Sequence, residues 1–190
     1  MKKITLLALM APMFACAFSF NDIPYWIGTG SKRAALVIDW KSGPGPQSLV
    51  WGYRFDGVKT GQDMFNAVIA ADSRLSYGLV PAVSYTAVER VSFDRNGGGI
   101  GAGDSDQQGW FTNGFWGYFV EPASTTSLPA WGFASEGFDT RILADGSWDG
   151  WSWAQDFNGT SPSQPTPVPE PITATILGMA FICMKKSRKN

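Results

Sequence analysis

The sequence predicts an α+β fold, a single small domain with a mainly antiparallel sheet and one main helix. Apolar runs of strand length come first, at residues 34–40 and 48–55, and a stretch with helical spacing follows at residues 60–72. A set of segments rich in aromatic and apolar residues comes later, at residues 82–93, 109–121, 130–133 and 147–153. A helix placed between early strands and a later antiparallel set is typical of this class.

Turn and capping residues set the boundaries of these early elements. The turn-rich sequence SGPGPQ precedes the second apolar run, and Asp56-Gly57 follows it. Thr60 and Asp63 have the spacing of a capping box, which predicts a helix start. Met64 and Val68 then repeat at helical spacing. We therefore expect one clear helix in this domain.

The N-terminus has the pattern of a secretory signal peptide. A lysine pair precedes an apolar stretch, and Ala15 and Ala17 supply the small-x-small site that signal peptidase accepts. We expect residues 1–17 to be removed, with an exported domain at residues 18–157. Lipidation of Cys16 is the alternative interpretation.

Composition excludes several classes of function. The chain has no histidine, which removes Ser-His-Asp triads, Cys-His dyads and histidine-zinc sites. Its two cysteines both lie in terminal apolar segments, so the domain has no disulfide. Six of the fifteen basic residues lie at the ends and all sixteen acidic residues lie between them, which leaves the body with a net charge of −7. We predict no nucleic-acid partner, no cofactor and no catalysis.

The C-terminus carries four features in a fixed order. A Pro/Ser/Thr linker, expected to be extended and flexible, spans residues 158–167 and precedes a short Pro-rich motif, an apolar helix of thirteen residues and a basic tip. The motif is Val168, Pro169, Glu170 and Pro171, the helix includes Ile172, Ile176, Leu177, Phe181 and Ile182, and the tip holds Lys185, Lys186, Arg188 and Lys189. This helix would be roughly 20 Å long, shorter than the ~30 Å hydrocarbon core. The positive-inside rule places the tip in the cytoplasm and the body outside.

This order of features resembles the PEP-CTERM sorting signal of Gram-negative bacteria, which the membrane protease exosortase recognises. The resemblance covers residues 168–190. It implies that the tail holds the protein in the inner membrane, body in the periplasm, until exosortase cuts near the motif. The body then passes to the cell surface or extracellular matrix, where extracellular polysaccharide is an expected partner. An ordinary linker before a weak anchor is the alternative.

Nine tryptophans allow two interpretations. They fill a core that has no disulfide, or some of them form an aromatic surface that stacks on a ligand. The candidates for the ligand-facing role are Trp110, Trp116, Trp148 and Trp151. The patterns DGVKTGQDMFNAVIAAD, GWFTNGFWGYFV and ILADGSWDGWSW also resemble bacterial surface domains related to the C-terminal domain of the vitamin B12 carriers transcobalamin and intrinsic factor. The alternative function is therefore a surface module that binds a glycan or a corrinoid-like ligand.

Two groups of polar residues have less specific patterns. The loop at residues 94–109 offers oxygen ligands for Ca²⁺ from Asp94, Asn96, Asp104 and Asp106, although a solvated loop is favoured. The carboxylates of Asp139, Asp145 and Asp149 lie near tryptophans in the sequence and could serve a glycosidase. Asp-Gly is also a common turn dipeptide, and that interpretation is preferred.

Overall fold

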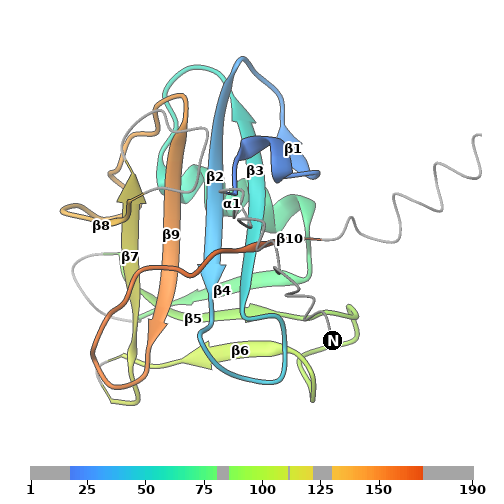
Figure 1. Ribbon diagram of the computed structural model, residues 1–190, viewed down its shortest axis with the longest axis vertical. Helices are drawn as coiled ribbons and strands as arrows, with labels where there is room; N and C mark the ends of the chain where they lie inside the picture. The colour runs from blue at the N-terminus through green and yellow to red at the C-terminus, as the bar shows by residue number, and fades with distance from the viewer. Residues whose placement is uncertain (1–17, 81–85, 111, 122–129, 169–190) are drawn as a thin grey trace, which may run out of the picture.

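The computed structural model describes residues 18–80, 86–110, 112–121 and 130–168, and it confirms the α+β class (Figure 1). The described residues form one α-helix, a short 3₁₀ helix η1 at Phe20–Asp22 and two sheets. The predicted signal peptide, most of the sorting motif, the apolar helix and the basic tip lie outside the described residues. No helix within the described part is long and apolar enough to cross a membrane.

The main sheet is mixed. Its strands are β1 (Trp26–Gly28), β2 (Lys32–Asp39), β3 (Ser48–Phe55), β7 (Phe115–Glu121), β8 (Gly132–Phe133), β9 (Ser147–Ala154) and β10 (Thr166–Pro167). They run in the order β1-β3-β2-β9-β7-β8, with β10 also paired to β3. Pairs β2/β3, β7/β9 and β7/β8 are antiparallel, whereas β2/β9, β1/β3 and β10/β3 are parallel. None of the parallel pairs joins consecutive strands, because a short hairpin can connect only antiparallel strands.

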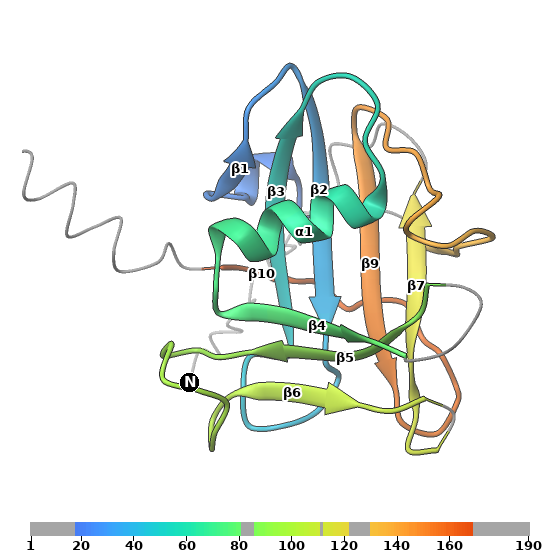
Figure 2. The same cartoon turned by 180° about the vertical axis from the view of Figure 1, so that it is seen from behind.

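The second sheet is small and wholly antiparallel. It consists of β4 (Leu75–Leu79), β5 (Val88–Phe93) and β6 (Ser105–Gln108). Helix α1 (Gly61–Ala71) and this sheet cover the same face of the main sheet, and the small sheet's strands run across those of the main sheet (Figure 2). The predicted capping box is confirmed. The Asp63 backbone N–H donates a hydrogen bond to the Thr60 hydroxyl, and the Thr60 backbone N–H donates one to the Asp63 carboxylate.

The alternation of strand side chains divides the apolar residues between two cores. On β2, Leu36 and Ile38 point toward α1 and the small sheet, where Trp51 and Trp151 also lie. The other face holds Val37, Val50 and Trp148, which pack against the N-terminal residues Phe18, Phe20 and Ile23. Both faces are therefore covered, which explains how the domain stays folded without a disulfide.

Three predicted strands are shorter than expected, among them β8, which begins at Gly132 rather than at residue 130, and four observed strands, β1, β4, β6 and β10, were not predicted. The range 82–93 contains β5, which begins at Val88, with residues 81–85 outside the described part. The range 109–121 contains β7, which begins only at Phe115. Strand β6 lies inside the region expected to be a polar loop, and β4 follows α1 after a turn. Strands β4 and β6 depend on pairing with β5, and β1 and β10 depend on pairing with β3, rather than on a local apolar pattern.

The segment at residues 158–167, predicted to be a flexible linker, lies against the main sheet. Lys41 Nζ donates to the Ser161 carbonyl at 2.8 Å, and the Ser163 backbone N–H donates to Asp39 Oδ2 at 2.7 Å. Strand β10 then pairs with β3, and Val168 is completely buried in the core. Polar side chains and backbone groups bind this segment to the sheet, an interaction that its composition does not reveal.

Candidate ligand-binding cleft

An aromatic cleft of about 220 Å³ lies beside β7 and β9, where the start of β5 and the segment after β8 meet them. Aromatic rings make up most of its lining, with Trp110, Phe115, Trp116, Tyr118, Phe133, Phe138 and Trp151 contributing. Small side chains and Glu136 complete it. The cleft is therefore mainly apolar, with one charged residue among those that line it.

Strand register explains how the central rings meet. Tyr118 of β7 lies opposite Trp151 of β9, and their rings are stacked with centroids 4.6 Å apart. Phe138 stands at right angles to this pair, 5.3 Å from the Trp151 ring with an interplanar angle of 89°. The three rings therefore form two walls with different orientations.

Three of the four tryptophans expected to face a ligand come together here. Trp116 and Trp151 are each only 5% exposed, so they lie at the floor of the cleft. Trp110 is more exposed and lines it as well. The prediction is wrong for Trp148, which points to the opposite face and is fully buried against Phe20, with ring centroids 4.8 Å apart. Its role is to fill the core.

A buried ionic network lies behind Tyr118. The Tyr118 hydroxyl donates to Asp149 Oδ2 at 2.5 Å, and Arg141 Nε donates to Asp149 Oδ1 at 2.9 Å. Arg141 also donates to the Glu121 carbonyl. Burial raises the pKa of Asp149, an effect that Arg141 opposes, and burial followed by the Asp149 charge raises the pKa of the Tyr118 hydroxyl.

The structure assigns each of the three candidate hydrolytic carboxylates to a separate structural contact. Asp149 is buried in the network just described. Asp139 accepts a hydrogen bond from the Thr86 hydroxyl at 2.7 Å, and Asp145 accepts one from the Arg33 backbone N–H at 2.8 Å. The arrangement therefore offers no support for a pair of carboxylates flanking a glycosidic bond.

The three aspartates among the four residues considered for Ca²⁺ also make separate structural contacts. Asp94 accepts backbone N–H bonds from the glycine-rich turn that follows it, which lowers the pKa of its carboxyl. Asp104 accepts from the Arg95 and Gly101 backbone, and Asp106 pairs with Arg90. Within the described residues, no group of three or more acidic, histidine or cysteine side chains is placed to hold a metal ion. The side chain of Asn96 has no role in these contacts, although its backbone N–H donates to Asp94.

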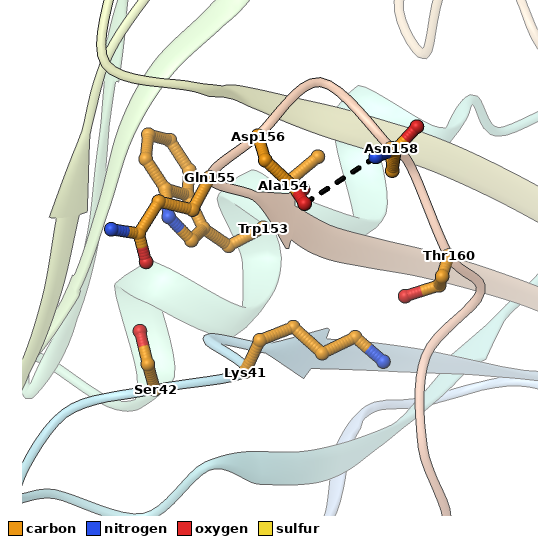
Figure 3. Close-up of a pocket in the computed structure, with 8 residues that line it drawn as sticks. All are labelled: Lys41, Ser42, Trp153, Ala154, Gln155, Asp156, Asn158 and Thr160. Atoms are coloured by element: carbon orange, nitrogen blue, oxygen red, sulfur yellow. Dashed lines mark hydrogen bonds between the residues drawn. The ribbon is translucent and has the colours of Figure 1, made fainter.

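A second, polar cleft of about 620 Å³ lies where the chain leaves β2 and β9 (Figure 3). Lys41 and Ser42 form one side and residues 153–160 form the other, with Asn158 donating to Asp156. Trp153 lines it but is 4% exposed, so its ring offers no flat platform for a sugar. The Lys41 ammonium is already bound to Asp39 at 2.9 Å and to the Ser161 carbonyl. In this cleft, the hydrogen bond from Lys41 binds the C-terminal segment to the end of β2.

Sequence reasoning missed several residues of the aromatic cleft. The aromatic residues of GWFTNGFWGYFV include Phe115, so this pattern could have predicted it as a cleft residue. Phe133 is the last residue of β8 and Glu136 lies in the irregular segment after it, and only the fold brings these two residues to the cleft. Comparison with known proteins adds no assignment, because no family model, curated protein or solved structure matches this chain.

Proposed function

We propose that this chain is an exported, non-catalytic protein of the cell envelope or extracellular matrix, sorted through a C-terminal PEP-CTERM signal and cleaved by exosortase. The observation that carries the proposal is the order of the motif, the apolar run and the basic tip at residues 168–190, and the burial of two residues of the body is compatible with it. Phe18, the residue after the expected signal-peptidase site, is 7% exposed, and Val168, the first residue of the motif, is 0% exposed. The packed body therefore reaches both expected processing sites.

This agreement has a physical meaning. Cleavage after Ala17 keeps Phe18 in the core on one face of the sheet, where it packs with Phe20 and Ile23. Cleavage after Val168 keeps β10 paired with β3. Processing at these two sites thus removes the terminal apolar segments and leaves a complete folded domain to reach the cell surface.

The hydrogen bonds of the carboxylates near the aromatic cleft support the proposal that the protein is not catalytic. The carboxylates nearest the aromatic cleft, apart from Glu136, are held in buried or partly buried bonds to Arg141, Tyr118 and Thr86. A general acid or base has to reach a substrate proton directly or through one water. Glu136 alone would have no partner group of the kind that paired-carboxylate hydrolysis needs.

The test is the intact mass of the protein in each cell fraction of its native host. We expect a species that begins at Phe18 and ends between residues 168 and 171, located at the outer surface or in the medium. A Glu170→Ala variant should accumulate uncut in the inner membrane, whereas Asp156→Ala, which removes an exposed carboxylate upstream, should be sorted normally. An unmodified chain that keeps residues 185–190 and stays in the inner membrane would overturn the proposal.

A second candidate function is ligand binding by the body, and the aromatic cleft favours it. Ligand sites are typically apolar concavities with a few polar groups. The volume of about 220 Å³ is below the roughly 300–1,000 Å³ typical of drug-sized ligands, so the described cleft is too small to enclose a corrinoid ring. Quenching of tryptophan fluorescence across a panel of small ligands tests this function, and the absence of any saturable change would count against it.

A further inference from the structure

The geometry points to a small organic cation, of the quaternary ammonium or methylated amine class, as the ligand of the aromatic cleft. This inference rests on the second candidate function, because it names the ligand class of the same site. It depends on three properties of the cleft: the arrangement of its rings, the balance of charge around it and the state of its hydrogen-bonding groups.

Aromatic rings line the cleft: Trp110 and Phe133 are its more exposed rings, and the buried rings of Tyr118, Trp151 and Phe138 form its floor. The face of an aromatic ring carries partial negative charge, and indole is the strongest of the natural side chains in this respect. Tyr118 and Trp151 are nearly parallel, with an interplanar angle of 20°, whereas Phe138 is close to perpendicular to both. Trp110 and Trp116 add two further indoles to the lining. Rings in several orientations around one small volume are the usual setting for a quaternary ammonium group.

The charges around the cleft favour a cation over an anion. Glu136 is exposed and is the only charged residue among those that line the described cleft, with no lysine or arginine beside it. The nearby guanidinium of Arg141 is neutralised by Asp149 at 2.9 Å. Asp139, bonded to the lining residue Thr86, adds a second negative charge close by. A bound cation would therefore be attracted, and an anion would find no partner.

The hydrogen-bonding groups argue against a sugar. The Thr86 hydroxyl donates to Asp139, the Tyr118 hydroxyl donates to Asp149, and Trp116 Nε1 donates to the Gln107 carbonyl at 3.2 Å. Sugar hydroxyls leave water at a cost unless the site supplies new partners. A trimethylammonium group needs no such partners, because it has no N–H and its charge is spread over methyl groups.

The experiment titrates the full-length chain, in maltoside micelles that carry no charge, with choline and with its neutral isostere 3,3-dimethylbutan-1-ol. Tryptophan fluorescence and calorimetry report binding. A cation–π contribution of about 0.5–2 kcal/mol predicts that choline binds about 2- to 30-fold more tightly than the isostere. The Glu136→Gln variant should lose several-fold in choline affinity with the isostere unchanged, and Asp156→Asn, which removes an exposed charge outside the cleft, should bind as the unmodified chain does.

The possible outcomes separate this inference from the functions on which it rests. Binding of the isostere as tightly as choline would overturn the cation class while leaving the cleft as a ligand site. An Asp156→Asn effect as large as that of Glu136→Gln would show that only the overall charge acts, and would also overturn it. No saturable signal with either ligand would overturn both the class and the binding function. Sorting is measured independently by the mass of the processed chain.

Discussion

The ion pair of Arg141 and Asp149 is the most buried in the described part of the chain, and the Arg141→Met substitution would break it. Arg141 Nε lies 2.9 Å from Asp149 Oδ1, with side chains 6% and 1% exposed. Methionine fills part of the space of the arginine stem but leaves the Asp149 carboxylate buried, with the Tyr118 hydroxyl as its remaining side-chain donor. Removing one partner of a buried pair costs about 3–5 kcal/mol. We expect this loss in the free energy of unfolding at neutral pH.

The size of this loss should depend on pH. Burial raises the pKa of Asp149 even with Arg141 present, and removing Arg141 raises it further. A carboxyl whose pKa is higher in the folded state stabilises the fold fully below its unfolded pKa of about 3.9, and this contribution is lost as pH rises through the folded pKa. The variant should therefore recover part of its stability when the pH is lowered from about 8 to about 5, because Asp149 takes up a proton.

Urea denaturation followed by tryptophan fluorescence measures both effects, since Trp151 stacks on Tyr118. The matched control is Arg90→Met. Its partner Asp106 is 28% exposed and Arg90 is 42% exposed, so breaking this pair should cost about 1 kcal/mol or less. An Arg141→Met variant no less stable than Arg90→Met, or one whose deficit is the same at both pH values, would refute the reasoning.

Three further changes test the helix start and the C-terminal segment by urea denaturation. Thr60→Ala removes the capping hydroxyl and should cost about 1 kcal/mol; an unchanged midpoint would mean that the capping box contributes nothing. Gly61→Ala places a Cβ 2.6 Å from Asp149 Oδ2 and should cost about 1–3 kcal/mol, whereas the control Gly98→Ala, with open space around it, should be neutral. Val168→Ala should cost about 2 kcal/mol, from roughly 0.8 kcal/mol for each lost methyl group plus the cavity; a neutral result would contradict the burial of this residue.

The parts of the fold that the sequence predicts are those with local signals. The capping box of Thr60 and Asp63 and the apolar spacing after it predict α1 to within a residue at each end. Turn residues likewise define β3. Strand β6 has the sequence SDQQ, with no apolar alternation, and exists because its backbone pairs with β5 and because Asp106 binds Arg90. Such pairing joins distant segments and leaves no local pattern to recognise.

The site shows the same division between local and distant information. Trp148 and Trp151 are three residues apart on one strand, so alternation alone places them on opposite faces. The sequence therefore indicates that both cannot face one ligand. It does not indicate which face stays open, because that depends on where α1, the small sheet and the N-terminal segment pack. Glu136 reaches the cleft through the same long-range arrangement.

Strands β1 and β10, near the two ends of the described body, both pair with β3, and the proposed processing would have to leave both pairings intact. Strand β1 pairs with β3 at residues 52–54, and β10 pairs with the same strand at residues 49–50 (Figure 1). A cut within residues 158–165 would remove β10 and leave part of β3 unpaired, and an unpaired edge promotes aggregation. A cut after Phe18 or Phe20 would strip the core that covers Trp148. Processing signals placed just outside both segments are therefore compatible with a stable product, and signals a few residues further inside would not be.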